Sequence, residues 1–461
     1  MLNPYIEAVE LRELVLRREV RPREVAEFFL ARIERLNPRL GAYMTVAAER
    51  ALADAERLEE LSPAEAAAMP LFGVAYSLKD LTWTRDIRTT LGSRNFENFR
   101  PRADAELAVR LRNAGGILLG KTTTPELGGR PTTEGGLCPP ARNPWNLEHS
   151  AGGSSGGAAA QVAAGMGPLA EGTDGGGSIR VPAACSGVVG LKPSRGRVSF
   201  APVMGEGWAG LATEGPIARS VRDAALMLDV MAGPVVGDPY WAPPPPRPFV
   251  SAVADRPKGL HLAMIAGSAL GPVDPEVTVA LEHAADVFRA MGHRVEPVHI
   301  DPAQRLIEYT RLAISAGLAS VPIKNPDLMD PVVRRAWEFG RRLSATDYVG
   351  ALARMHNTAR EIVQALAPYD ATLAPTLPHP APRLGMPTDK FEDELYPFIQ
   401  FTFPYNATGQ PAFSLPNGFS RAGLPIGLQI IGRQADELGI IALAAQFEEA
   451  RPWRDLRPPL D

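Results

Sequence analysis

The sequence predicts an α/β protein in which helices cover a β-sheet. Segments whose apolar residues recur at helical spacing alternate along the chain with short apolar segments of strand length. The 461 residues are 45% hydrophobic and 22% charged, which is enough apolar content for a large core. No internal repeat interrupts the alternation. We therefore expect one domain over residues 1–461, with a proline-rich surface excursion at about 233–250.

The individual elements follow from spacing and from residues that begin or end helices. Residues 22–36 carry apolar side chains at helical spacing, and Pro22 suits the first turn of a helix. Residues 71–78 are mostly apolar, so we expect a buried strand with Lys79 at its end. Asp104 is expected to cap the next helix. The same criteria predict helices at 104–114, 220–231 and 275–291, and strands at 117–119, 261–265 and 293–300.

Composition excludes several classes of partner. The net charge is −4 with basic and acidic residues intermixed, so the sequence lacks the clustered basic face that nucleic acid requires. Cys138 and Cys185 are too few for a disulfide framework, which favours a reducing compartment. No stretch reaches the roughly 18 apolar residues of a membrane span. We expect a cytoplasmic protein that acts on a small molecule without nucleic acid or membrane; a homodimer is compatible with the sequence, which does not determine the oligomeric state.

Two short motifs suggest chemistry that their context opposes. Residues 115–122, GGILLGKT, match the phosphate-binding pattern, but a helix precedes them and their centre is apolar, so we expect a buried strand. Residues 152–156, GGSSG, match the nucleophile-elbow pattern of α/β-hydrolases, which would make Ser154 the nucleophile of an esterase. That pattern needs a preceding strand, and residues 147–150 are not a convincing one; none of the seven histidines is marked as the base. The Ser154 esterase stays open as an alternative.

Two runs of glycine and serine carry a different chemistry. Residues 150–157, SAGGSSGG, and 172–180, GTDGGGSIR, flank an alanine-rich segment that favours a helix. A flexible linker is the simplest interpretation, but the apolar neighbours place these glycines inside a folded core. Glycines beside a serine allow successive amides to converge on one point, as in an oxyanion hole. Each such donor is worth roughly 3 kcal/mol of barrier in acyl transfer, and 175–178 have a suitable composition.

Taken together, these motifs resemble the amidase signature family. The matching segments are PLFGVAYSLKD around Lys79, the block DAELAVRLRNAGGILLGKTTTPEL, RNPW at Arg142, SAGGSSGGAAA, GTDGGGSIRVPAACSGVVGLKPSRGRV and, near the C-terminus, TGQPAFSLPNGFSRAGLPIGLQIIG. They follow the family's order and cover most of the chain, with the weakest similarity between residues 233 and 394. The resemblance implies a large twisted mixed β-sheet covered on both faces by helices.

The resemblance also implies an activity and a set of site residues. The activity is hydrolysis of a carboxylic amide to an acid and an amine or ammonia through an acyl-enzyme, without metal or cofactor. The implied catalytic residues are Ser178 as nucleophile, Ser154 as a bridging serine held by a cis peptide, and Lys79 as base. A lysine acts as a base only when neutral, so its pKa must be lowered by burial. The further residues implied are the oxyanion-hole amides of Gly175, Gly176, Gly177 and Ser178, the supporting Ser155, Thr173, Asp174 and Arg180, and Gly128 for substrate binding.

Each of these residues also has an ordinary structural interpretation. Lys79 could be a solvated charge at a strand end, and either serine could be a turn residue. Glu171 stands where relatives commonly have a small apolar residue. We interpret it as a solvated charge, with tuning of Asp174 and Arg180 as the alternative.

The substrate is less well defined than the reaction. The wording GDPYWAPP from Gly237 and the triple glycine resemble hydrolases of the cyclic 6-aminohexanoate dimer. The glutaminase subunit of a tRNA-dependent amidotransferase and a non-catalytic binding protein are the alternatives, although residues 130–140 lack the usual wording of the amidotransferase subunits. We expect the substrate loops at 128–133, 204–211 and 378–404, with an apolar pocket formed by Trp208, Phe391, Tyr396, Phe398 and Phe401.

Overall fold

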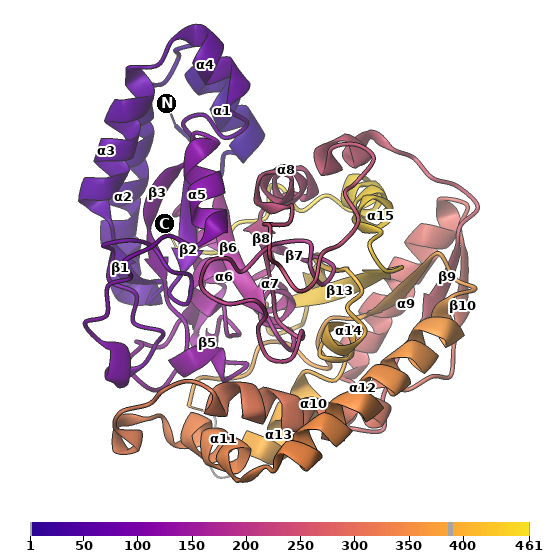
Figure 1. Cartoon of the computed structure of the whole chain (residues 1–461). Coiled ribbons are helices and arrows are strands. Elements are labelled where there is room, and N and C mark those ends of the chain that lie inside the picture. Colours follow the sequence, from indigo (N-terminus) through magenta and orange to yellow (C-terminus); the bar gives the residue numbers. More distant parts are fainter. Residues whose placement is uncertain (1, 386–390, 461) are drawn as a thin grey trace.

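The protein is built around one large mixed β-sheet (Figure 1). The computed structural model describes residues 2–385 and 391–460, without the side chains of 391–394. Within them, an 11-stranded sheet has the order β1-β3-β2-β6-β8-β7-β12-β13-β11-β9-β10, and β4 and β5 form a separate two-stranded sheet. The strands are β1 (Tyr43–Val46), β2 (Ala75–Lys79), β3 (Ile117–Thr122), β4 (Arg142–Asn143), β5 (Asn146–Ser150), β6 (Leu169–Asp174), β7 (Val189–Lys192), β8 (Thr213–Ala218), β9 (His261–Met264), β10 (Arg294–Pro297), β11 (Ala371–Pro375), β12 (Ala412–Phe419) and β13 (Pro425–Gly432).

Helices lie along both faces of this sheet. They are α1 (Ala8–Leu16), α2 (Pro22–Leu40), α3 (Ala48–Glu59), α4 (Pro63–Ala68), α5 (Glu106–Asn113), α6 (Gly156–Ala163), α7 (Arg180–Ser186), α8 (Val221–Met231), α9 (Pro275–Ala290), α10 (Pro302–Ala319), α11 (Pro331–Arg342), α12 (Ala345–Leu366), α13 (Phe391–Phe398), α14 (Pro404–Ala407) and α15 (Glu437–Ala450). None of the helices in the described residues is long and apolar enough to cross a membrane.

Successive residues of the central strands enter different hydrophobic cores. Leu373 of β11 packs into a core with α8, α9 and α15, whereas the next residue, Ala374, packs into one with α10 and α12. Ile430 and Ile431 of β13 divide in the same way. Because side chains alternate across a strand, this division shows that both faces of the sheet are covered. The predicted α/β class with a two-sided mixed sheet is confirmed.

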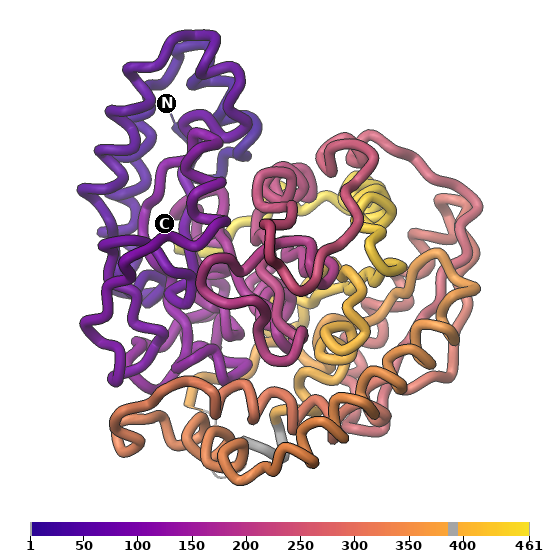
Figure 2. Tube along the Cα trace, viewed as in Figure 1, coloured from indigo at the N-terminus to yellow at the C-terminus, as the bar shows by residue number. Residues whose placement is uncertain are grey.

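The topology brings two strand ends together. β2 pairs in parallel with both β3 and β6, so the carboxyl ends of β2 and β6 lie at the same edge. Lys79 ends β2, and Asp174 ends β6. β6 then pairs antiparallel with β8. The chain's last turn returns to α2, where Arg39 Nη1 donates to Leu460 O at 3.1 Å, and Figure 2 shows the two ends on the same side of the molecule.

Most predicted elements are present, with two differences of physical interest. The segment GGILLGKT forms β3, which is buried along its whole length, as expected. The helix expected from Asp104 instead begins at Glu106, because the Asp104 carboxylate accepts from Arg85 N at 2.7 Å and pairs with Arg112. Residues 147–150 do form a strand, within β5, but it belongs to the separate two-stranded sheet. Its residues are half-buried or exposed except for the buried Ser150, which explains why the sequence did not favour a strand there.

Candidate functional site

Lys79 lies at the end of the buried strand β2, where its amino group faces two hydroxyl groups. Its side chain is 0% exposed, and Nζ lies 2.8 Å from Ser154 Oγ and 2.7 Å from Thr173 Oγ1. Burial lowers the pKa of Lys79 to about 7, although the carboxyl groups of Glu171, Asp174 and Glu214 act to raise it. A lysine with this pKa is substantially neutral at physiological pH and can accept a proton. The interpretation as a solvated strand-end charge is wrong.

Ser154 lies in the turn that leads from β5 into α6. The peptide bond between Gly153 and Ser154 is cis, as the resemblance implies. Gly128, at the end of the 3₁₀ turn Glu126–Gly128, approaches this serine closely, since a Cβ atom there would come within 3.1 Å of Ser154 Oγ. Gly128 therefore lies directly against Ser154, and its contact with substrate stays a prediction.

Ser178 lies in the loop between β6 and α7 and is half-buried. The adjacent Ser155 holds this loop, because its N–H donates to Ser178 O at 3.2 Å and its hydroxyl donates to Thr173 O at 3.3 Å. No hydrogen bond joins the hydroxyls of Ser154 and Ser178 in the part of the chain that the structure describes. Catalytic hydrogen bonds commonly tighten only when substrate is bound.

The glycine loop before Ser178 presents some of its amides and uses another internally. Gly177 N–H donates to Asp174 Oδ1 at 2.7 Å, which removes it from the four amides expected to bind an oxyanion. Within the described residues, the N–H groups of Gly175, Gly176 and Ser178 donate to no protein group. These three are the donors left for a negatively charged oxygen.

A buried ion pair fixes this loop to the rest of the protein. Arg180 donates to both carboxylate oxygens of Asp174, through Nη2 at 2.8 Å and Nε at 3.0 Å, and both side chains are 0% exposed. Burial would raise the pKa of Asp174, but Arg180 and the amide of Asn406 hold it well below its usual range. Asn406 also donates to Asp174 O at 2.8 Å. The same guanidinium donates to Thr402 O and Gln429 Oε1.

Three buried polar residues near Lys79 or Arg180 were not singled out from the sequence. Asn406 precedes the matching C-terminal block, Gln429 falls within it, and Glu214 lies on β8. Asn406 and Gln429 are separated from Arg180 by 226 and 249 residues. The one local signal for Gln429 and Glu214 is that each is a polar residue within an otherwise apolar strand, which marks it as a buried polar group.

Glu171 is buried, which contradicts its interpretation as a solvated charge. Its side chain is 0% exposed, and Oε2 accepts from Lys79 N at 2.8 Å and from Thr82 Oγ1 at 2.9 Å. The error has a topological cause, because β6 is an interior strand between β2 and β8, and an acidic residue there has no route to solvent. Glu171 contacts the backbone of Lys79 rather than Asp174 or Arg180.

Ser178 opens onto an apolar cavity, which we call the Ser178 cavity. Residues from all three expected substrate loops line it, together with residues of α7 and α10 that were not expected. Trp208 and Tyr396 lie in the lining as predicted, but Phe398 and Phe401 belong to the hydrophobic core. The Phe391 side chain lies outside the described part of the chain. The lining consists of Gly128, Gly129, Arg130, Pro131, Gly153, Gly176, Gly177, Ser178, Val181, Trp208, Ile314, Leu395, Tyr396 and Ile399.

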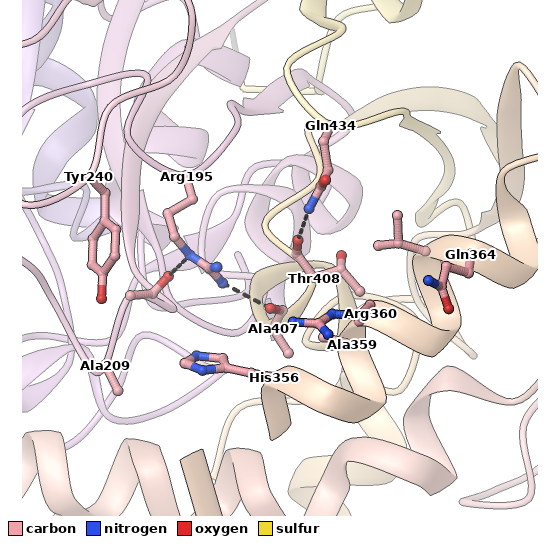
Figure 3. Close-up of a pocket in the computed structure, with 12 residues that line it drawn as sticks. Arg195, Ala209, Tyr240, His356, Ala359, Arg360, Gln364, Ala407, Thr408 and Gln434 are labelled. Atoms are coloured by element: carbon pink, nitrogen blue, oxygen red, sulfur yellow. Dashed lines mark hydrogen bonds between the residues drawn. The ribbon is translucent and has the colours of Figure 1, made fainter. Parts of the chain in front are cut away.

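A second hollow lies against α12 and does not contain the predicted site residues. Its volume is about 410 Å³, and Figure 3 shows Arg195, Tyr240, His356 and Arg360 around it. The Arg195 guanidinium is turned toward backbone carbonyls, donating to Gly210 O at 2.6 Å and to Ala407 O at 2.8 Å. Arg195 therefore serves to hold α14 in place. Among the described residues, no group of three or more His, Cys, Asp or Glu side chains is arranged to hold a metal ion.

Comparison with known proteins gives consistent similarities along the whole chain. The amidase family model matches residues 24–441. A putative amidase from Synechocystis sp. is 38% identical over 452 residues, which are 96% of this chain and 88% of that protein. A glutamyl-tRNA(Gln) amidotransferase subunit from Geotalea daltonii is 34% identical over 482 residues, 98% of each chain. The solved structure of a 6-aminohexanoate cyclic dimer hydrolase complexed with substrate superposes with a TM-score of 0.93 at 32% identity and covers 100% of both chains.

Proposed function

We propose that this chain, which belongs to the amidase family and hydrolyses a carbon–nitrogen bond of a carboxylic amide, does so with Ser178, Ser154 and Lys79. The observation that carries this proposal is the 2.8 Å contact between the buried Nζ of Lys79 and Ser154 Oγ, beside the cavity that contains Ser178. A serine hydroxyl becomes an effective nucleophile when a base takes its proton. Neutral Lys79 is suited to be that base.

In the acylation step, Ser178 Oγ attacks the amide carbon while its proton passes to Ser154 Oγ. Ser154 gives its own proton to Lys79 Nζ, so the lysine becomes charged. The carbonyl oxygen becomes negative and is held by the amides of Gly175, Gly176 and Ser178. When the carbon–nitrogen bond breaks, the same path returns the proton to the leaving nitrogen. The products of this step are an amine or ammonia and an ester on Ser178.

In the second step, water replaces the amine at the same position. It loses a proton through Ser154 to Lys79 and attacks the ester carbon. The bond to Ser178 Oγ breaks as the proton returns to it, which releases the carboxylic acid and restores the free enzyme.

The Ser178 cavity favours substrates with apolar groups near the amide. Val181, Trp208 and Ile314 line it, and the one charged side chain among the described residues of its lining, Arg130, is paired with Asp330 at 3.1 Å. Aryl amides, alkyl amides and the cyclic 6-aminohexanoate dimer all present apolar surface. The similarity to the cyclic dimer hydrolase makes this dimer the first substrate to assay.

The catalytic assignment is tested by replacing and by labelling the serines. Ser178→Ala should reduce amide hydrolysis by several orders of magnitude, because it removes the nucleophile. A fluorophosphonate should form its adduct on Ser178, located by peptide mass spectrometry. An adduct on Ser154 instead would favour the α/β-hydrolase alternative, and full activity of Ser178→Ala would exclude the proposal.

The glutaminase of a tRNA-dependent amidotransferase is the second candidate, favoured by the similarity to an amidotransferase subunit. The two candidates differ in whether a partner is required. The purified chain alone should release amine from simple amides if it is a stand-alone amidase, and should need its partner proteins if it is a glutaminase.

We further propose a cytoplasmic location, in agreement with two free cysteines. Light scattering of the purified chain will show whether it is a homodimer.

A further inference from the structure

Two buried carboxyl groups meet on the sheet next to Lys79. Glu171 of β6 and Glu214 of β8 are 0% and 5% exposed. In the antiparallel register Glu214 is opposite Thr173, so Glu171, two residues earlier on β6, lies on the same face and diagonal to Glu214. Long side chains reach each other across such a diagonal. The two carboxyl groups are therefore neighbours.

Each carboxyl group has an oxygen that receives no hydrogen bond. Glu171 uses Oε2 for Lys79 N and Thr82 Oγ1, while its Oε1 is buried without a partner. Oε2 of Glu214 is also buried without a partner. Leaving such an acceptor unpaired costs about 1–3 kcal/mol, and more when it is charged. A proton on one of these oxygens, donated to the other, would satisfy both.

Electrostatics also opposes ionisation of both groups. Burial raises the pKa of Glu171, and its hydrogen bonds and the charges of Lys79 and Lys121 offset only part of this rise. Burial and the neighbouring Glu171 hold the pKa of Glu214 well above its usual range. Two adjacent buried carboxylates cannot both ionise without a large cost, and a pair of this kind commonly retains one proton.

The other charged groups near Lys79 have partners of their own or lie toward solvent, so the protonation state of this pair decides how much negative charge Lys79 experiences. Asp174 is neutralised by Arg180, and α6, which packs on β6 and β8, contributes no charged side chain. The other charged groups on the elements packed against Lys79 and the pair have separate surroundings. The cations donate to neighbouring oxygens: Lys121 to Thr82 O and Thr84 Oγ1, Lys192 to Pro193 O, and Arg32 to Ala164 O. The carboxylates accept hydrogen bonds of their own: Asp80 from Thr90, Asp223 from Ala8 N and Val9 N, and Asp229 from Phe249 N and Val250 N. Arg222 and the remaining charged residues of α2 are exposed or half-buried.

We propose that Glu171 and Glu214 share one proton and present a single negative charge to Lys79, and that this charge sets the pH at which the lysine becomes a base. Glu171 acts as a positioning residue, because it holds the backbone N–H of Lys79 rather than the substrate. The inference rests on the proposed role of Lys79 in catalysis.

The pH dependence of kcat/KM distinguishes this state from the alternatives. In the wild type, activity falls as the pH decreases through about 7, where Lys79 gains a proton. In Glu171→Gln or Glu214→Gln, the remaining carboxyl group gives up the shared proton, so one negative charge stays. The acidic limb of the profile, which is the fall of kcat/KM at low pH, therefore moves little. The double variant loses the negative charge of the pair and keeps only that of Asp174 among the carboxyl groups that raise the Lys79 pKa, so its limb should move to lower pH by about 1 unit or more.

The matched control is Glu448→Gln on α15. Glu448 is also a carboxyl group whose pKa burial raises, to about 8, but it accepts from Val221 N and does not contact Lys79. Its substitution should leave the acidic limb in place. Equal and additive shifts in the two single variants would mean that both carboxyls are charged, and an unmoved limb in the double variant would mean that neither is; either outcome overturns the proposal.

An infrared measurement tests the shared proton without relying on activity. The wild type at pH 7 should show the carbonyl stretch of a protonated carboxyl group that disappears in each folded single variant, because the remaining carboxyl ionises. If the difference spectrum lacks this band, the shared proton is excluded. If the band is present but the wild type has no acidic limb near pH 7, the role of Lys79 as base fails instead.

Discussion

At the scale of single residues, Gly175 in the loop before Ser178 packs against Trp208, which lines the Ser178 cavity. A Cβ atom on Gly175 would lie 2.6 Å from Trp208 Cε3, and one on Gly317 of α10 would lie 2.5 Å from Trp208 Cδ1. The indole is thus held between the loop and the helix. This contact leaves no room for a larger side chain at position 175 unless Trp208 moves.

Gly175→Ala should weaken substrate binding by displacing Trp208. Overpacking of this kind costs about 1–3 kcal/mol, so we expect KM for an apolar amide to rise by about 10-fold, which corresponds to ~1.4 kcal/mol. Steady-state kinetics on an aryl amide would measure it. Gly267→Ala is the control, because a Cβ atom there meets nothing within 4 Å. An unchanged KM in Gly175→Ala would show that Trp208 does not shape the binding site.

Some residues of the proposed site can be predicted from a local sequence motif, whereas others depend on how the strands pair. Lys79, Ser154 and Ser178 each lie in a contiguous motif, so the sequence could predict them. Glu214 could not be predicted, because its neighbours depend on the pairing of β6 with β8, and pairing order is not encoded in local spacing. Glu171 was misjudged for the same reason, since an acidic side chain is rarely buried and only the strand order places it inside.

At the scale of elements, the Asp174–Arg180 pair ties β6 and α7 to α14 and β13. The guanidinium reaches Asn406 Oδ1 at 2.7 Å and Gln429 Oε1 at 2.7 Å. These contacts fix the loop that contains Ser178 at both of its ends. The pair therefore contributes both to folding and to the geometry of the proposed nucleophile.

Arg180→Ala should lower the free energy of unfolding by about 3–5 kcal/mol, because it leaves Asp174 buried and uncompensated. Urea denaturation followed by circular dichroism would measure the change. Arg421→Ala provides the comparison, since Arg421 pairs with Glu276 while its side chain is 95% exposed, and such pairs are worth about 1 kcal/mol or less. A loss no larger than that of Arg421→Ala would contradict the assigned importance of the buried pair.

Helices and strands were predicted correctly where the spacing of apolar residues in the sequence matches the residues that are buried in the structure. β3 and α9 have strong apolar patterns with clear ends, and both were placed to within a few residues. β5 was missed because its strand is polar and pairs with β4 and with Arg383, outside the large sheet. The cap at Asp104 was wrong because a distant amide, Arg85 N, competes for the carboxylate. Such competition depends on tertiary contacts that a local pattern does not contain.

At the scale of the whole molecule, the sheet joins segments from both halves of the chain. β7, before the proline-rich stretch, pairs with β12, more than 200 residues later, with Lys192 opposite Ala412. β8 and β12 thus flank β7 in one sheet. The excursion at 233–250 therefore connects two parts of a single layer, which supports one domain over residues 1–461.

This arrangement predicts that the protein unfolds as one unit and tolerates a cut in the excursion. The six tryptophans are spread from Trp83 to Trp453, so their fluorescence should follow the same urea transition as circular dichroism. Limited proteolysis should cut first near the exposed Val236 and Trp241. Because β7 and β12 lie on opposite sides of that cut, the two fragments should elute together in gel filtration and retain amide hydrolysis. Two separate transitions, or fragments that separate under native conditions, would instead indicate two domains divided at the excursion.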